Sequence, residues 1–131
     1  MKYIFSLIII LSCIFIFSCS NSKNKVNKII NSTSISAKAL KALIDSKENI
    51  YVIDVRSKDE YFGKVGHIDG SKLIPLQTIA NSITNLKDLK ETIYVVCLSG
   101  KRSGIAAKIL TDNGITALNM AGGMLAWNKL K

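Results

Sequence analysis

The most constraining feature of the chain is a cysteine placed between an apolar run and the start of a helical pattern. Residues rich in β-branched side chains, Ile93 to Val96, lead directly to Cys97. A loop of polar and glycine residues follows, and apolar residues from Ile105 to Leu110 then recur with helical spacing. The sequence therefore predicts a buried strand, a loop and a helix in that order, with the thiol at the end of the strand.

A cysteine in this position has the surroundings of a nucleophile. The start of a helix exposes unpaired backbone N–H groups and a partial positive charge, which stabilise an anion such as a thiolate. Nearby cations lower a thiol pKa further, and Lys101 and Arg102 follow shortly after Cys97. An isolated cysteine at a strand end is more often a small buried apolar residue. Here Gly100 and the two cations favour Cys97 as the candidate nucleophile.

The size and charge of the chain limit the alternatives. Its 131 residues suffice for one domain with a single core. The net charge of +9 would suit nucleic acid, but the lysines are spread along the sequence and only two arginines occur, so nucleic-acid binding is not expected. The sequence contains no CxxC pair and no Cys/His cluster, so neither a structural zinc site nor a cofactor is expected.

The first residues differ in kind from the rest of the chain. Lys2 is followed by an almost unbroken apolar run from Tyr3 to Phe17. Such a run is short for a bilayer of about 30 Å, and a signal peptide over residues 1–18 accounts for it better. An uncleaved N-terminal anchor and a plain secretory signal are the alternatives.

Residues 16–19 resemble a bacterial lipobox, in which the cysteine after a small residue is lipidated and becomes the first residue of the mature chain. Phe17 is bulky for that pattern, and Ile16 stands where leucine is usual. The resemblance implies a lipid on Cys19 and, over residues 19–34, a polar linker. It further implies a protein anchored to a membrane of the bacterial cell envelope and facing the periplasm or the exterior.

The predicted leader changes the meaning of the three cysteines. Cys13 lies within the apolar run and would be removed with it, while Cys19 would carry the lipid. Cys97 is then the one free thiol of an exported chain and has no partner for an intramolecular disulfide. A single thiol of that kind is a candidate for reactivity.

The folded domain is expected over residues 35–131, with strands that alternate with helices. Strands are predicted at residues 50–55, 73–76, 93–96 and 117–120, and helices after Ser36, after Ser57, from Ile79 to Leu86, from Arg102 to Asn113 and from Met124 to Trp127. Ser36 and Ser57 are typical helix caps, and Pro75 places its short strand at a sheet edge or terminus. This alternation predicts a three-layer α/β/α domain with a mainly parallel central sheet.

Three polar side chains lie close to predicted strands or loops. Asp54 and Arg56 stand at the carboxyl end of their strand, where ligands bind in open α/β sheets. Because they are two residues apart on a strand, they share a face and can pair with each other. The single histidine, His67, lies in a glycine-punctuated loop. A general base is one interpretation of His67, and a residue that fixes the loop by hydrogen bonds is the preferred one.

Taken together, these residues resemble the rhodanese (sulfurtransferase) domain family over Ile35 to Leu130. Four blocks carry the resemblance: Ile53-Asp54-Val55-Arg56 with Glu60-Tyr61, Gly66-His67-Ile68-Asp69-Gly70-Ser71 leading to Ile74-Pro75-Leu76, Cys97 to Arg102, and Gly122-Gly123 with Trp127. The order and spacing of the four blocks make the resemblance specific. It implies the rhodanese-like fold and gives Asp54 and Arg56 a supporting role beside the active loop.

The resemblance implies that Cys97 accepts a sulfane sulfur from a small donor, thiosulfate or a polysulfide or persulfide, or from a protein. The acceptor would be cyanide or a thiol, including the thiol of a protein. Donor and sulfur would contact the loop residues Leu98, Ser99, Gly100, Lys101, Arg102 and Ser103. Their backbone N–H groups would converge on the sulfur, and Lys101 and Arg102 would attract an anionic donor. Leu98 stands where thiosulfate-using members commonly carry arginine.

The length of the loop separates related chemistries. Four residues lie between Cys97 and Arg102, as in rhodaneses. The dual-specificity phosphatases of similar fold, and the arsenate reductases that resemble them, have one more and a wider cradle for a tetrahedral anion. Sulfur transfer is therefore favoured over phosphate or arsenate chemistry. A non-catalytic rhodanese-like module that binds a partner or carries sulfur is the other alternative.

Overall fold

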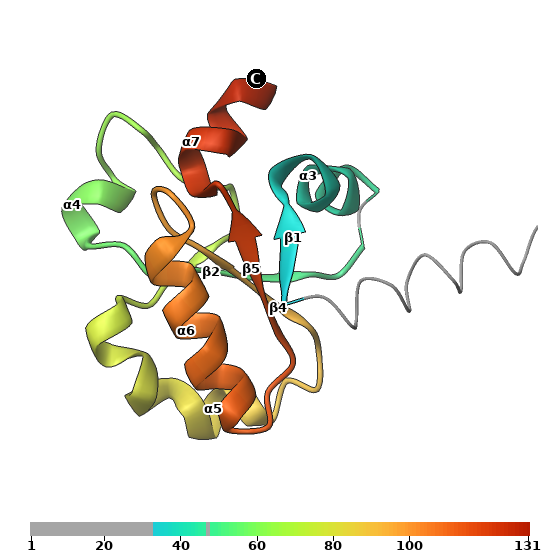
Figure 1. The fold of residues 1–131 in the computed structure, drawn as a ribbon, viewed down its shortest axis with the longest axis vertical. Helices are drawn as coiled ribbons and strands as arrows, with labels where there is room; N and C mark the ends of the chain where they lie inside the picture. The colour runs from blue at the N-terminus through green and yellow to red at the C-terminus, as the bar shows by residue number, and fades with distance from the viewer. Residues whose placement is uncertain (1–32, 47) are drawn as a thin grey trace, which may run out of the picture. The chain divides into compact units, whose positions relative to one another are not determined.

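The four segments predicted as strands join a fifth in a sheet in which every pair is parallel (Figure 1). The computed structural model describes residues 33–46 and 48–131, and the predicted signal peptide, Cys19 and most of the linker lie outside them. The strands are β1 (Ser34–Ser36), β2 (Tyr51–Asp54), β3 (Lys72–Leu73), β4 (Ile93–Val96) and β5 (Ala117–Ala121). Their order is β1-β5-β4-β2-β3, so β4 is the central strand. The predicted α/β class is confirmed.

Helices cover both faces of the sheet (Figure 1). The helical segments are α3 (Ala37–Asp45), α4 (Lys58–Tyr61), α5 (Ile83–Lys87), α6 (Lys101–Asp112) and α7 (Gly123–Trp127), with 3-10 turns η1 (Leu76–Ser82) and η2 (Asn128–Leu130). α3 and α7 pack together, while α6 packs with η1 and against β4 and β5. Within the described residues, no helix is both long and apolar enough to cross a membrane.

The alternation of side chains along β4 directs the thiol toward α6. Ile93 and Val95 belong to a buried apolar cluster that includes Ala106 and Leu110 of α6. Residues two apart on a strand point to the same face. Cys97 continues this series, is 1% exposed and belongs to the same cluster. The strand pattern therefore places the sulfur beneath the first turn of α6.

Three elements differ from the sequence prediction. β1 is not predicted, because three residues with two serines give no recognisable strand pattern, yet β1 pairs with β5 along the edge of the sheet. β3 is shorter than predicted and ends before Pro75, at an edge as expected. The segment predicted as a helix near Ile79 is a 3-10 turn followed by the short α5. Its threonine, asparagine and serine residues are weak helix formers, which explains the difference.

A buried ion pair closes the carboxyl end of β2. Arg56 Nε lies 2.9 Å from Asp54 Oδ1, and Arg56 Nη2 lies 2.7 Å from Asp54 Oδ2. Nη2 also donates to the Gly66 carbonyl at 2.7 Å. The two charged side chains are no more than 1% exposed. The predicted pairing is confirmed, and through Gly66 it also ties β2 to the following loop.

We expect Arg56→Ala to lower the free energy of unfolding by about 3–5 kcal/mol, because it leaves the Asp54 carboxylate buried without its counter-ion. The measurement is equilibrium unfolding in urea. Lys41→Ala is the matched control, since it removes an exposed ion pair with Asp45 and should cost less than about 1 kcal/mol. Equal losses in the two variants would contradict a structural role for the buried pair.

Candidate active site

The candidate site lies where the chain reverses its direction across the sheet. β3 follows β2 toward one edge, and the chain then returns to β4 and continues to β5 on the other side. Open α/β sheets bind ligands at such a switch point, outside the carboxyl ends of the strands. Here the carboxyl ends of β2 and β4 are neighbours, since Asp54 pairs with Val96. The sheet therefore brings Asp54, Arg56 and Cys97 to the same edge.

Hydrogen-bond donors surround the sulfur of Cys97. The Gly100 backbone N–H donates to Cys97 Sγ at 3.1 Å, and the Ser103 hydroxyl lies 3.2 Å from Sγ. Gly100 has φ of 95° and would place a Cβ 3.0 Å from the Gly122 backbone nitrogen, so this position requires glycine. The turn at Gly100 directs the following amides toward the strand end.

These donors lower the pKa of the Cys97 thiol. Burial is the largest single influence and acts in the opposite direction, because it disfavours the charged form. Hydrogen bonds from the Ser103 hydroxyl and from the backbone N–H groups of Ser103, Gly100 and Ser99 outweigh it together and hold the pKa below its ordinary value. Of the amides predicted to contact the thiol, that of Gly100 donates to Sγ in the structure, and Cys97 is the one free cysteine within the described residues.

Ser103 connects the thiol to the neighbouring strand β5. Its hydroxyl lies 2.6 Å from Asn119 Oδ1 as well as 3.2 Å from Cys97 Sγ. A hydroxyl has one proton and can donate to one of these acceptors at a time. Ser103 can therefore donate to Asn119 while Cys97 is a thiol, and to Cys97 once the sulfur carries a negative charge.

The start of α7 holds the outer side of the loop from Cys97 to Arg102. The Met124 N–H donates to the Cys97 carbonyl at 2.8 Å, and the Leu125 N–H donates to the Leu98 carbonyl at 3.0 Å. A Cβ on Gly123 would lie 2.4 Å from the Cys97 carbonyl oxygen, so only glycine permits this approach. The Gly122-Gly123 pair therefore makes the contact between α7 and the loop possible.

The two cations of the loop have different surroundings. Arg102 makes two hydrogen bonds of 2.6 and 2.7 Å to the Glu60 carboxylate of α4. This contact is the main reason that the pKa of Glu60 falls to about 2. Lys101 is exposed at the first position of α6. The charge of Arg102 is thus balanced before any donor binds, which sequence reasoning did not anticipate.

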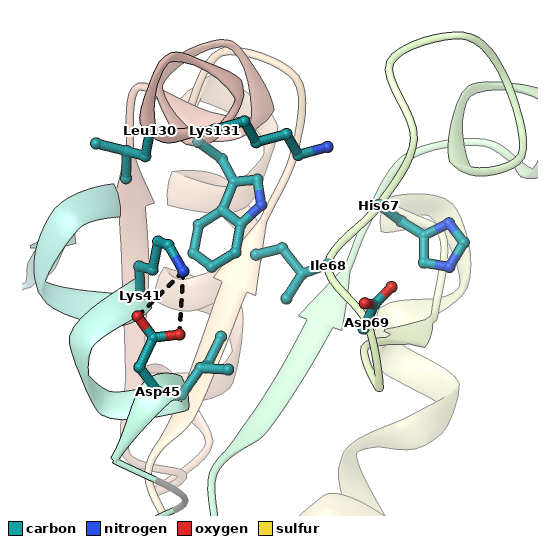
Figure 2. Close-up of a pocket in the computed structure, with 9 residues that line it drawn as sticks. Lys41, Asp45, His67, Ile68, Asp69, Leu130 and Lys131 are labelled. Carbon is teal, nitrogen blue, oxygen red and sulfur yellow. Dashed lines mark hydrogen bonds and ion pairs between the residues drawn. The ribbon is translucent and has the colours of Figure 1, made fainter.

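His67 fixes a loop, as predicted, and lines a pocket away from the thiol. His67 Nδ1 donates to the Tyr61 carbonyl at 3.0 Å, and its ring stacks on Tyr61 with centroids 3.9 Å apart. His67 lines a pocket of about 270 Å³, and Figure 2 shows it across that pocket from the Lys41–Asp45 ion pair. None of the predicted site residues lines this pocket. His67 therefore has no contact with Cys97 that a general base would need.

Three residues of the site were not predicted as members of it. Glu60 was named only within a family block; in the structure it completes a capping box with Ser57, and its second contact, with Arg102, has no signal in the local sequence. Asn119 is a polar residue in an otherwise apolar strand, and that irregularity is a usable signal. Gly123 was named only within a family block, whereas its role depends on close approach to Cys97.

Comparison with known proteins agrees with this geometry. Residues 36–130 match the family model described as "Rhodanese-like domain". A Bacillus subtilis protein named "Putative sulfur carrier protein YrkF" is 36% identical over 94 residues, covering 71% of this chain and 49% of the relative. Another, "Putative sulfurtransferase YtwF", is 37% identical over 93 residues, covering 71% of this chain and 87% of the relative. The chain thus spans about half of the first relative and most of the second.

Solved structures agree as well. A rhodanese-like domain protein from Staphylococcus aureus is 35% identical, with a TM-score of 0.66 over 73% of this chain and 91% of that one. The family match covers most of the chain, and the TM-score shows that the fold resembles that of the Staphylococcus aureus protein. The chain belongs to the rhodanese-like domain family, a family of sulfurtransferases and sulfur carriers.

We expect Ser103→Ala to raise the pKa of the Cys97 thiol, because it removes the side-chain hydrogen bond that favours the thiolate. A depressed pKa increases the thiolate fraction at neutral pH, so the rate of iodoacetamide alkylation should reach its half-maximum at a higher pH in the variant than in the wild type. Ser99→Ala is the matched control, since it removes an exposed hydroxyl and keeps the backbone N–H. An unshifted pH profile for Ser103→Ala would show that the Ser103 hydroxyl does not lower the pKa of Cys97.

Proposed function

We propose that this protein is a sulfurtransferase that carries a sulfane sulfur on Cys97 as a persulfide. The observation that carries the proposal is the convergence of the Gly100 amide and the Ser103 hydroxyl on Cys97 Sγ, together with the lowered pKa of the thiol. A thiolate is the reactive form of cysteine toward sulfur donors. Membership of the rhodanese-like family and the names of the relatives support the same chemistry.

In the loading step, the Cys97 thiolate attacks the outer sulfur of the donor. A new S–S bond forms to Sγ, and the bond between the outer sulfur and the rest of the donor breaks. The leaving group takes the bonding electron pair: sulfite leaves from thiosulfate, and a thiolate leaves from a persulfide. No external oxidant or reductant is needed. The backbone N–H groups around the sulfur stabilise the negative charge of the persulfide formed.

In the discharge step, an acceptor such as cyanide or a thiolate attacks the outer sulfur of the persulfide. A bond forms between acceptor and outer sulfur, the Sγ–S bond breaks, and its electron pair returns to Cys97 Sγ. The thiolate is again stabilised by the loop amides, so both halves of the cycle use the same donors. This preorganised stabilisation is the contribution of the protein to the reaction.

The narrow surroundings of the thiol favour sulfur over phosphate chemistry. Cys97 is 1% exposed, and the turn at Gly100 brings its N–H to 3.1 Å from Sγ. A sulfane sulfur is a single terminal atom, whereas a phosphoryl group needs room for three equatorial oxygens. Arg102, which would stabilise such oxygens, is paired with Glu60. A sulfur carrier without turnover of its own is the second candidate, and the name of the first relative supports it.

We expect the purified protein without its predicted leader, residues 20–131, to gain the mass of one sulfur atom after exposure to thiosulfate or a polysulfide. Intact-mass spectrometry measures the adduct, which should be absent in Cys97→Ser. Release of the sulfur to cyanide or a thiol over repeated cycles distinguishes an enzyme from a carrier. If no donor produces an adduct on Cys97, the proposal is wrong.

For localisation, we propose that Cys19 carries a lipid that anchors the protein in the bacterial cell envelope. The lipobox-like residues before it and the polar segment after it support this assignment. Metabolic labelling with a fatty-acid analogue should mark the full-length protein and fail to mark Cys19→Ala. Cys13→Ala is the matched control and should label normally. Label that persists in Cys19→Ala would refute lipidation at this position.

A further inference from the structure

A cavity of about 320 Å³ adjoins the loop that carries the thiol. It lies between α4, the segment after α4 and the loop from Cys97 to Arg102, and it is lined by Arg56, Asp59, Glu60, Gly63, Lys64, Val65 and Leu98. Leu98 directly follows Cys97, so one wall of the cavity belongs to the residue next to the reactive sulfur. A volume of this order suits a small organic molecule.

The charges that line the cavity cancel. Its cations are Arg56 and Lys64, and its anions are Asp59 and Glu60. Two of the four are also engaged outside the cavity, because Arg56 pairs with Asp54 and Glu60 pairs with Arg102. A small dianion such as thiosulfate would therefore meet no surplus of positive charge there. A surplus of positive charge would be needed to select an anionic ligand over a neutral one.

The uncharged part of the lining suits hydrocarbon. Val65 and Leu98 present aliphatic side chains, Gly63 presents backbone, and the aliphatic stem of Lys64 can cover further apolar surface. Each methylene group that moves from water into such surroundings contributes up to about 0.8 kcal/mol, or about fourfold in an equilibrium constant. The affinity of the cavity for a substrate should therefore rise with the length of the substrate's carbon chain.

We propose that this cavity selects low-molecular-weight thiols and persulfides with an uncharged, apolar carbon body in preference to thiosulfate. The inference rests on the proposed sulfur-transfer function and names its substrate class. In discharge, the thiolate of the small molecule attacks the outer sulfur of the Cys97 persulfide. The product is the organic persulfide, and the electron pair of the broken Sγ–S bond returns to Cys97. Loading by an organic persulfide is the reverse of this step.

The experiment follows discharge of the Cys97 persulfide by ethanethiol, 1-propanethiol and 1-butanethiol. These thiols have similar intrinsic reactivity and differ in apolar length. The second-order rate constant should rise about two- to fourfold per methylene in the wild-type protein. As a second measurement, alkylation of the unloaded thiol by N-alkyl iodoacetamides of increasing chain length should show the same trend, without any sulfur transfer.

Leu98→Arg tests the cavity directly. It replaces an apolar wall by a cation, so the dependence on chain length should disappear and loading from thiosulfate should increase about tenfold. Ile105→Arg is the matched control, because Ile105 is 56% exposed on α6, lies outside the cavity lining and would introduce the same charge on the helix that follows the loop. The control should keep the wild-type dependence on chain length.

The outcomes separate the two proposals. A persulfide that forms on Cys97 but discharges at the same rate for all three thiols would overturn the cavity assignment and leave sulfur transfer intact. An equal gain of thiosulfate loading in Leu98→Arg and Ile105→Arg would also overturn it, because it would show a general effect of charge. Failure of every donor to load Cys97 would overturn the proposed function and this inference with it.

Discussion

The candidate site depends on the orientation of the peptide groups that carry the Cys97 and Leu98 carbonyls. Backbone N–H groups can converge on Cys97 Sγ only if the carbonyl groups of the same loop point away from it. The carbonyls of Cys97 and Leu98 do so and accept hydrogen bonds from Met124 and Leu125 at the start of α7. The last helix of the domain thus fixes the geometry at the end of the central strand. Without these two bonds, the outward carbonyls would need other donors, and the loop would lose its defined conformation.

The fold determines the position of the thiol, and local hydrogen bonds lower its pKa. A parallel sheet places Cys97 at the carboxyl end of its central strand, and side-chain alternation turns the sulfur toward α6. Burial at that point raises the cost of a thiolate. The donors from Gly100 and Ser103 offset this cost within a few residues of chain. The site therefore combines an apolar location with a polar lining, an arrangement typical of reactive cysteines.

The sequence predicts most of the fold because its signals are local. The β4 strand, the cap at Ser36 and the pairing of Asp54 with Arg56 depend on residues close in the chain, and the structure contains all three. β1 was not predicted, since its strand character comes from pairing with β5. The contact of Glu60 with Arg102 joins segments far apart in sequence, and no periodicity or spacing indicates it. The candidate nucleophile was thus accessible to sequence reasoning, while the charge balance around it was not.

The Ser103 hydroxyl lies within hydrogen-bond distance of two acceptors, Asn119 Oδ1 and Cys97 Sγ, and has one proton to give. When the sulfur gains negative charge, the proton turns toward it and the Asn119 oxygen loses its donor. The ionisation of Cys97, at the end of β4, is thereby linked to the side-chain amide of Asn119 on the adjacent strand β5. The hydrogen bonding of the Asn119 side chain therefore depends on whether Cys97 is a thiol or a thiolate, although only Ser103 lies between the two residues.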